Sequence, residues 1–500
     1  MAVQDQREVR VQADHVADAT RRWSPTLGVA ALTLLALLSR FGRLGHWGFD
    51  SDEIFMLRDS MHPGFTNPRP LLYFLNHLIA PVLPLDEFGL RFLPAVFGVL
   101  AVPAIYLVGR RLVGSRGAFF ASLLVTLSGL LLIYSQFGRY WSLVFLLCAI
   151  YPYALYLGVR EHDRRALTIG IITGLLACVA HPTSVLLVGG PAIWFLAIWL
   201  RPGNLAALWR RPQVRWGALA LIIALCVIAW RFVPILHHWV SSHDNNPGSG
   251  QFLLRQHVPL GLKQAFLLLA YVQGLTFSVV WTGLVGLFLL WRDRDRFLAQ
   301  YLASVAAFPI AFITLTSIRT PVSTYYMVPA APVFFLGAGY FLDRIFATPW
   351  STRPRWLVPA TVLGLMLLEG MPTFVSQYLN GRRYDFKSTA QWLRPRLTSH
   401  DVVFSDQPVA LQQYLPQLEV ERLRYDTEPL AHSLEQVRAT SGAALWVVAP
   451  APAHAFRTNL KQGGLADWLY AKCQLRNSIG QGRVDFREQY LQVFRCPPSS

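Results

Sequence analysis

The stretch FLPAVFGVLAVPAIYLVGRRLVGSRGAFFASLLVTLSGLLLIY, residues 92–134, consists of two apolar runs separated by a short segment with three arginines. The runs cover 92–109 and 117–134, and each is close to the roughly 20 apolar residues that a helix needs to cross a bilayer. Two such runs joined by a short basic loop predict a pair of membrane-spanning helices whose loop is cytoplasmic.

Apolar runs of similar length recur along the chain, which is 53% hydrophobic and only 15% charged. Soluble proteins carry about 25% charged residues, so this composition indicates a polytopic membrane protein. Two other apolar stretches, 70–85 and 258–274, are short or interrupted by proline, and we expect them to be interfacial or re-entrant helices. The further spans that we predict are 25–38, 141–159, 166–180, 184–200, 216–235, 276–291, 297–316, 326–342 and 356–375, which makes about eleven in all.

The net charge of +17 first suggests a nucleic-acid-binding protein. Its distribution excludes that class, because most of the excess lies in short loops between apolar runs, where it reports membrane topology. Arginine-rich loops alternate with arginine-poor ones, and the rich set is predicted to be cytoplasmic. That set comprises arginines 7, 10, 21, 22, 110, 111, 116, 160, 164, 165, 201, 210, 211, 215, 292, 294, 296, 344, 353 and 355.

This orientation divides the chain into three parts. Residues 1–24 form a cytoplasmic, disordered N-terminus, and the run that follows resembles a retained signal anchor. Residues 25–375 form the transmembrane domain, with an external loop at 40–91. An odd number of spans places residues 376–500 outside the cytoplasm, and we expect a multi-pass protein of a bacterial plasma membrane.

The C-terminal segment has a soluble character. DVVFSD (401–406) and ALWVVAP (444–450) are typical of buried strands, and LAHSLEQVRAT (430–440) of a helix between them. The alternation predicts a small extracytoplasmic α/β domain. Cys473 and Cys496 could form a disulfide there, and the sequence leaves this pairing open.

The first external segment contains HWGFDSDEIFMLRDS (46–60), in which Asp50, Asp52 and Glu53 lie among aromatic and aliphatic residues. Clustered carboxylates repel one another, which raises a pKa toward that of a general base. A solvated acidic loop is the alternative. The apolar neighbours favour carboxylates that are held at the membrane interface.

Other external helix ends carry arginines and aromatic residues. A single arginine at a helix end often anchors to lipid headgroups. Together with the acids, however, this set predicts one outward-facing site for an anionic, lipid-linked substrate. Its candidate substrate-binding residues are Arg69, Tyr73, Arg91, Tyr134, Gln136, Arg139, His181, Arg319, Tyr325 and Tyr326.

In residues 26–185 the sequence resembles the polytopic GT-C glycosyltransferases, in particular the family-39-like enzymes that include protein mannosyltransferases and aminoarabinose transferases. The matching residues are Asp52-Glu53, Pro68-Arg69-Pro70-Leu71 with Tyr73, Glu87, Arg91 and Pro94, Arg110-Arg111, Tyr134-Ser135-Gln136 with Arg139, and His181. The sequence departs from the family pattern in three ways. Pro68 replaces a histidine, Phe137 replaces an acid, and Tyr325-Tyr326 stands where Arg-Tyr is usual.

The resemblance implies inverting transfer of a sugar from a polyprenyl-phosphate donor to an extracytoplasmic lipid, glycan or protein. Asp52 would be the catalytic base with Asp50 in reserve, and Glu53 would orient the base or the acceptor. Arg139 and Arg69 would be the leading phosphate contacts, with Arg91 and Arg319 behind them. No cofactor is required and no metal site is assigned, although a divalent ion bridging the acids is left open. The expected partners are the donor, the acceptor and membrane lipids, without nucleic acid.

Two other functions compete with this one. A transporter or flippase of a lipid-linked sugar would need charged residues along a central path, and the predicted spans contain few. A non-catalytic scaffold would present the C-terminal domain. The sequence leaves open the sugar, the prenol, the acceptor, the oligomeric state and whether the C-terminal domain binds acceptor, acts as a lid or only packs.

Overall fold

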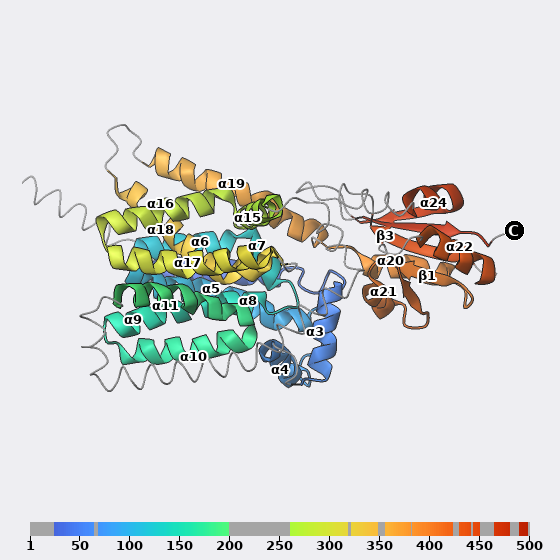
Figure 1. Ribbon diagram of the computed structural model, residues 1–500, viewed down its shortest axis with the longest axis horizontal. Helices are drawn as coiled ribbons and strands as arrows, with labels where there is room; N and C mark the ends of the chain where they lie inside the picture. The colour runs from blue at the N-terminus through green and yellow to red at the C-terminus, as the bar shows by residue number, and fades with distance from the viewer. Residues whose placement is uncertain are drawn as a thin grey trace, which may run out of the picture.

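The computed structural model describes residues 25–64, 69–199, 261–318, 322–348, 356–381, 383–423, 430–441, 444–450, 465–480 and 490–498. A bundle of helices is followed by a separate α/β domain at the C-terminal end (Figure 1). Helices α3 (Ser51–Met61) and α4 (Pro70–Ile79) lie at the end of the bundle that faces this domain (Figure 1).

The described helices of the bundle confirm a multi-pass architecture. Five are long and apolar enough to cross a membrane, or up to seven if each of two bent pairs counts as one span. The predicted total of eleven is therefore unconfirmed, and the predicted span 216–235 lies outside the described residues. The remaining helices are α2 (Pro25–Phe41), α5 (Gly89–Leu112), α6 (Ser115–Leu127), α7 (Gly129–Ser135), α8 (Trp141–Cys148), α9 (Tyr151–Arg160), α10 (Arg164–Ala180), α11 (Leu186–Trp199), α15 (Leu262–Leu275), α16 (Phe277–Asp293), α17 (Arg296–Thr316), α18 (Ala331–Ala347) and α19 (Leu357–Asn380), with 3-10 turns η1 (Pro182–Val185) and η2 (Thr324–Ala330).

The bundle contains two sharp bends between consecutive helices. Helices α15 and α16 meet at 90°, so residues 262–275 form a helix that is bent away from α16; the interfacial or re-entrant placement of 258–274 stays a prediction. Helices α6 and α7 meet at 60°, which breaks the predicted continuous span 117–134. The break at Ser128 is stabilised by its side chain, which accepts a hydrogen bond from the backbone N–H of Leu131.

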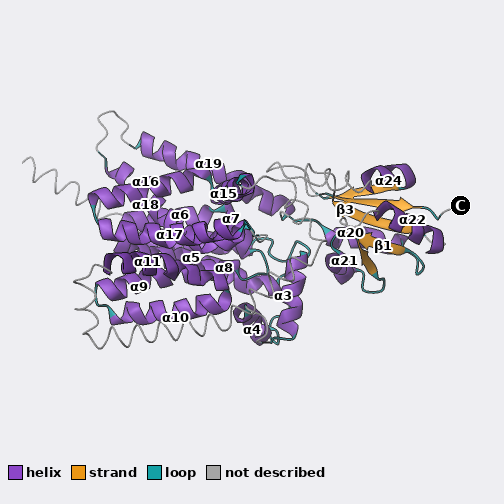
Figure 2. Ribbon diagram, in the orientation of Figure 1, coloured by secondary structure: helices purple, strands orange, loops and turns teal. Residues whose placement is uncertain are grey.

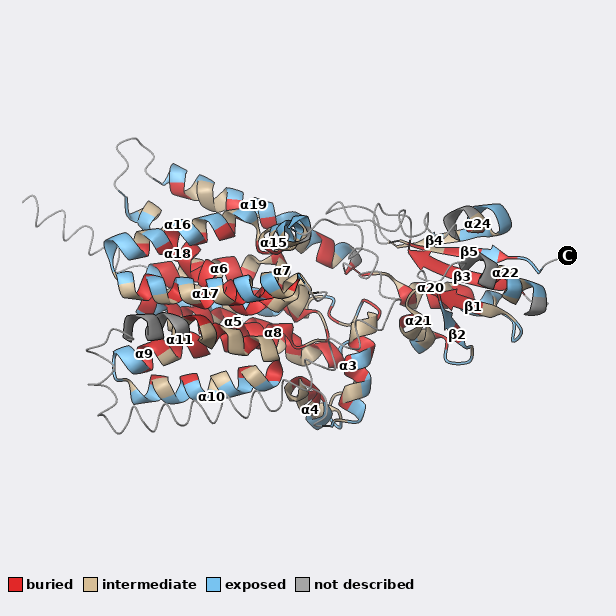
Figure 3. Cartoon of the chain, viewed as in Figure 1, coloured by how far each residue is buried: buried red, intermediate tan, exposed pale blue. Residues whose placement is uncertain are grey.

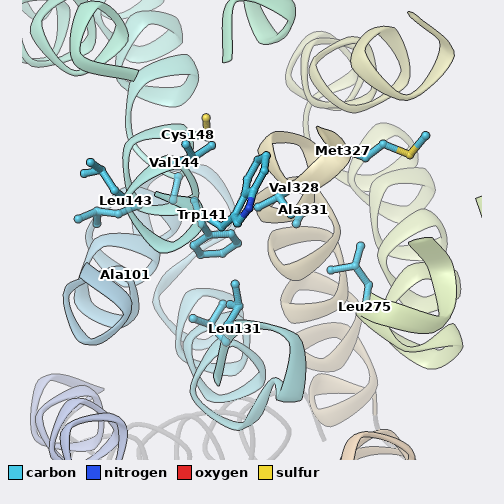
Figure 4. Packing of buried hydrophobic residues seen from close by; sticks show 14 of the residues in the cluster. Ala101, Leu131, Trp141, Leu143, Val144, Cys148, Leu275, Met327, Val328 and Ala331 are labelled. Carbon is cyan, nitrogen blue, oxygen red and sulfur yellow. The ribbon is translucent and has the colours of Figure 1, made fainter. Parts of the chain in front are cut away.

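The centre of the bundle is close-packed around buried helices. Figure 3 shows buried residues concentrated on central helices such as α5, α8 and α18, while α10 and α19 are largely exposed. Figure 4 shows Trp141 of α8 close to Val328 and Ala331, which joins α8 to the start of α18. Helices α16 and α18 meet through glycines, because a Cβ on Gly286 would lie 1.8 Å from the carbonyl oxygen of Gly337.

The C-terminal domain contains the only strands of the described chain (Figure 2). The strands β1 (Val402–Ser405), β2 (Val420–Arg422), β3 (Leu445–Pro450), β4 (Gln474–Ile479) and β5 (Leu491–Cys496) form one sheet of order β2-β1-β3-β5-β4. Strands β1, β2 and β3 are parallel, and β5 runs antiparallel to both β3 and β4. The helices are α20 (Phe386–Leu393), η3 (Arg394–Arg396), α21 (Pro408–Tyr414), α22 (Leu430–Ser441) and α24 (Leu465–Lys472).

These elements confirm the two predicted strands and the helix between them, and they place Cys473 and Cys496 in a disulfide. The chain enters the domain through Gly381, whose φ of +64° ends α19 in the left-handed region. A side chain there would also meet the ring of Trp47, at 2.6 Å from a Cβ. Glycine at 381 therefore allows the start of the domain to approach the loop between α2 and α3 closely.

Candidate functional site

The acidic stretch 46–60 contains helix α3, and its first carboxylates lie at the start of that helix. Asp50 is the N-cap and accepts a hydrogen bond from the backbone N–H of Asp52 at 3.0 Å. Glu53 accepts from the backbone N–H of Asp50, also at 3.0 Å, which completes a capping box. Burial raises the pKa of Asp50. The side chain of Asp52 is 47% exposed, so it is the most open carboxylate of the three.

Glu53 lies in a fully buried ion cluster instead of facing solvent. Its Oε1 accepts from Arg91 Nε and from the backbone N–H of Gly138, both at 2.7 Å. Its Oε2 accepts from Arg91 Nη2 and Arg383 Nη1, both at 2.7 Å. Burial alone would raise the pKa of Glu53, but the charges of Arg383 and Arg91 outweigh it and lower the pKa to about 2. Glu53 is therefore placed to orient the residues around it, and its predicted role toward the base or the acceptor stays a prediction.

Arg91 is also fully buried, and protein acceptors use its whole guanidinium. Two of its bonds go to Glu53, and the others go to the carbonyls of Leu44, Trp47 and Gly48 at 2.7–3.1 Å. All five N–H groups of Arg91 therefore have protein acceptors, so this arrangement does not favour the predicted contact with a lipid phosphate, which stays a prediction.

Arg383 was missed by the sequence analysis. It follows the end of α19, is 8% exposed, and reaches both Glu53 and the carbonyl of Gln136. The available signal was its place shortly after the last predicted span. We call Glu53, Arg91 and Arg383 together the Glu53 cluster.

Arg69 and Arg139 converge on Tyr140. Arg69 Nη1 donates to the phenolic oxygen of Tyr140 at 2.6 Å, and Arg139 Nη2 lies 3.5 Å from the same oxygen. Both guanidinium groups also lie over the Tyr140 ring, with centroid distances of 5.2 and 5.1 Å. Arg139 Nη1 donates to the backbone carbonyl of Asp52 at 2.9 Å, and its Nη2 lies 3.9 Å from the Asp52 carboxylate. Two cations and one exposed carboxylate are thus brought together.

Five aromatic rings adjoin this arginine pair. His181 lies 5.0 Å from Tyr140 and 4.8 Å from Trp141, measured between ring centroids. Tyr325 lies 4.8 Å from Trp141 and 4.7 Å from Tyr326. The structure therefore brings three predicted residues, His181, Tyr325 and Tyr326, to the arginine pair.

His181 presents one particular hydrogen-bonding group. Its Nδ1 lies 2.7 Å from the hydroxyl oxygen of Thr183 and accepts from the backbone N–H of the same residue at 3.2 Å. Acceptance at Nδ1 favours the neutral tautomer with a proton on Nε2. The residue is 1% exposed, and within the described chain Nε2 has no hydrogen-bond partner. His181 therefore offers a buried donor next to Tyr140.

Three other predicted substrate contacts, Gln136, Tyr73 and Tyr134, make contacts of their own with the protein. Gln136 donates to the backbone carbonyls of Ser39, Arg40 and Gly42 and accepts from Gln377 at 2.9 Å. Its buried amide is thus bonded to the protein, and its predicted contact with substrate stays a prediction. Tyr73 is 1% exposed and donates to the carbonyl of Gly64. Tyr134 is half-buried, with its ring 6.2 Å from that of Trp141.

The structure does not test two further predictions, the phosphate contact by Arg319 and the absence of a required metal. Arg319 lies outside the described residues. Among the residues that are described, no group of three or more His, Cys, Asp and Glu side chains could hold a metal ion. The expectation that no metal is required, with a divalent ion left open, remains a prediction.

The C-terminal domain contacts the acidic loop directly. Ser51 Oγ donates to Gln407 Oε1 at 2.5 Å, and the phenol of Tyr414 accepts from the backbone N–H of Phe49 at 2.7 Å. Tyr414 in turn donates to Glu87 at 3.0 Å. The loop that bears Asp52 is therefore held between the bundle and the domain.

Comparisons with known proteins identify this architecture. Apo ArnT from Cupriavidus metallidurans superposes with a TM-score of 0.56 at 15% identity, over 94% of this chain and 98% of ArnT. ArnT bound to undecaprenyl phosphate gives 0.52 at 14% identity over the same shares. The archaeal oligosaccharyltransferase AglB from Archaeoglobus fulgidus, in complex with an inhibitory peptide and a dolichol-phosphate, gives 0.53 at 11% identity, over 86% of this chain and 70% of AglB. The chain has the GT-C fold.

The GT-C fold spans the bundle and the C-terminal domain alike, since the match to ArnT covers nearly the whole chain. Residues 62–230 also match the family model described as dolichyl-phosphate-mannose-protein mannosyltransferase. That range includes Arg69, Arg139 and His181, whereas Asp52 precedes it. Among curated protein sequences, none matches the chain.

Proposed function

We propose that this protein is an inverting glycosyltransferase that moves a sugar from a polyprenyl-phosphate donor to an extracytoplasmic lipid, glycan or protein. The observation that carries the proposal is the arginine pair on Tyr140, with Arg139 Nη2 3.9 Å from the exposed carboxylate of Asp52. Paired arginines suit a phosphate, and an adjacent carboxylate suits an acceptor hydroxyl.

The chemistry follows from these groups. Asp52 takes the proton of the acceptor hydroxyl while the acceptor oxygen forms a bond to the anomeric carbon of the sugar. The bond from that carbon to the phosphate oxygen breaks, and its electron pair stays on the lipid phosphate. Arg139 and Arg69 stabilise the charge that develops there. Attack opposite the leaving group inverts the anomeric centre.

The protein surroundings support this assignment. The side chain of Asp52 is 47% exposed, while Asp50 is engaged as a helix cap and Glu53 is fully bonded, so Asp52 is the carboxylate best placed to meet an acceptor. His181 adds a neutral donor beside the arginine pair. The fold agrees, since ArnT with this fold is seen with undecaprenyl phosphate.

The orientation is also part of the proposal. We propose that the C-terminal domain lies outside the cytoplasm of a bacterial plasma membrane. The alternating arginine loops support this side of the membrane, and the Cys473–Cys496 disulfide agrees with an oxidising compartment. The site then opens on that side, because the loop bearing Asp52 contacts the domain.

A transfer assay with purified protein in detergent tests the function. The donors are undecaprenyl-phosphate-linked pentoses and hexoses, and the acceptor is an envelope fraction from cells that lack the gene. We expect sugar transfer that depends on the protein, with inverted anomeric configuration in the product. A flippase would give none, because no membrane separates two compartments in detergent, so absence of transfer with every donor would overturn the proposal.

A further inference from the structure

The Glu53 cluster joins the two parts of the proposed site. Its carboxylate receives five protein donors, from Arg91, Arg383, the backbone of Gly138 and the backbone of Asp50. Asp50 belongs to the loop that bears Asp52. Gly138 directly precedes Arg139. One buried carboxylate therefore holds both the segment of the proposed base and the segment of the proposed phosphate contact.

Arg383 strengthens the same link from a third direction. Besides Glu53, it donates to the carbonyl of Gly48 at 3.4 Å and to that of Gln136 at 3.3 Å. Gly48 lies in the acidic loop, and Gln136 begins the turn that ends in Arg139. Arg383 itself begins the connection from α19 to the C-terminal domain, so its position depends on how that domain sits.

Charge balance does not require this second arginine. Arg91 already pairs with Glu53 through two bonds, and burying another guanidinium is costly unless its hydrogen bonds are made. Arg383 adds a connection between two backbone segments. Its forked donors reach the carbonyls of Gly48 and Gln136, which Arg91 does not connect. A lysine could not reproduce this, since its ammonium is a single point of donation.

We propose that Arg383 is a positioning residue that sets the spacing between Asp52 and Arg139, and thereby makes the C-terminal domain part of the transfer site. The inference rests on the proposed function. Acceptor and leaving group must be aligned together for transfer, and a misplacement of about 1 Å can cost a hundredfold in rate. Loosening the cluster should therefore impair the alignment of a large acceptor more than that of water.

The ratio of donor hydrolysis to sugar transfer therefore distinguishes a positioning role of Arg383 from a purely structural one, which would leave that ratio unchanged. In hydrolysis, a water oxygen bonds to the anomeric carbon, the carbon–oxygen bond to the lipid phosphate breaks, and Asp52 takes a proton from the water. The products are free sugar and the lipid phosphate. Water is small and can adjust to a displaced carboxylate, whereas an acceptor held elsewhere on the protein cannot.

The experiment compares R383K and R383Q with the wild type and with R396Q, a change of an exposed arginine in the same domain. The donor and envelope fraction that give the highest wild-type turnover are used, at equal amounts of folded protein. We expect both Arg383 variants to lose transfer by about a hundredfold. Free sugar should fall much less, so the ratio of hydrolysis to transfer rises at least about tenfold, while the KM for the donor stays within about twofold of the wild type.

Each other outcome decides the matter. If hydrolysis and transfer fall in the same proportion, Arg383 only supports the fold and the inference is wrong. If R383K behaves like the wild type, the forked geometry is unnecessary and the inference is wrong. If the wild type transfers no sugar from any donor, the proposed function itself fails, which is distinct from a failure confined to the Arg383 variants.

Discussion

Asp52 and Arg139 face each other across the start of helix α3, with Oδ2 and Nη2 3.9 Å apart and a 2.9 Å hydrogen bond from Arg139 to the Asp52 carbonyl. The group proposed to take a proton and the group proposed to receive a leaving phosphate are thus neighbours in space, although 87 residues separate them. The side chain of Asp52 is 47% exposed, which suits contact with a mobile acceptor. That of Arg139 is 13% exposed, which suits binding of a fixed anion.

Substitution of Asp52 tests the base. D52N keeps the size of the side chain and removes its basicity, so we expect transfer to fall at least about a hundredfold with normal membrane insertion. Turnover is measured in membranes that contain equal amounts of protein, with E421Q, an exposed change in strand β2, as the control. Activity near that of the wild type would remove Asp52 from the reaction.

Substitution of Arg139 tests the phosphate contact. R139A removes charged hydrogen bonds worth about 2 kcal/mol, so we expect kcat/KM for the lipid donor to fall about thirtyfold. R110A, an exposed change at the other end of the bundle, is the control. A saturation curve for the donor that is unchanged in R139A would exclude this arginine from the site.

Asp52 and Arg139 also show how much of the candidate site the sequence predicts. The motif order pointed to Asp52, Arg69, Arg139 and His181, and the structure brings them to one end of the bundle. Glu53, Arg91 and Gln136 belong to the same motifs, yet their hydrogen bonds go to the protein. A sequence shows that a polar residue lies near an external helix end, but it does not show which acceptors or donors have already satisfied it.

Arg383 illustrates the opposite failure. Its bond to Glu53 spans 330 residues, and no periodicity or spacing in the chain connects them. The two bends of the bundle differ in the same way. The sequence separates residues 258–274 from the span that begins at 276, which agrees with the bend between α15 and α16, whereas it gives no sign of the bend between α6 and α7 within 117–134. Apolar length predicts that a segment lies in the membrane more readily than it predicts where the helix breaks.

Substitution of Glu53 tests the buried cluster. E53Q leaves two buried guanidinium groups without their counter-charge, so we expect a loss of about 3 kcal/mol in stability. E161Q is the control, because Glu161 pairs with Arg111 at an exposed position where such a pair contributes little. The fraction of protein that stays folded after heating is compared in the same detergent. Equal thermal stability of both variants would contradict the role given to Glu53.

The C-terminal domain should respond to pH through Asp406, which directly follows strand β1. Burial raises the pKa of Asp406 from 3.8 to about 7. A folded-state pKa above the unfolded value means that the associated stability is complete below about pH 3.8 and is lost as the pH rises through 7. The loss is up to about 4 kcal/mol.

The check is thermal unfolding of the full chain at pH 5 and pH 8. The wild type should lose stability in its C-terminal domain between these values, and D406N should not, while the exposed change E419Q should behave like the wild type. If D406N shows the same pH dependence as the wild type, another group is responsible.

The disulfide between Cys473 and Cys496 provides a test of both the domain and its compartment. It links the residue before strand β4 to the last residue of β5, so it joins the two antiparallel strands at the end of the sheet. Closing this loop should stabilise the domain by about 3 kcal/mol. The double variant C473S/C496S should therefore unfold its C-terminal domain at lower denaturant concentration, whereas C178S, at a cysteine outside this pair, should not.

Alkylation of whole cells before and after reduction then reports the state of the pair in place. We expect the two cysteines to be protected until a reductant is added, because thiols outside the cytoplasm are oxidised. Free thiols at both positions in growing cells would contradict the extracytoplasmic placement of the domain, and with it the side of the membrane on which Asp52 and Arg139 meet their substrates.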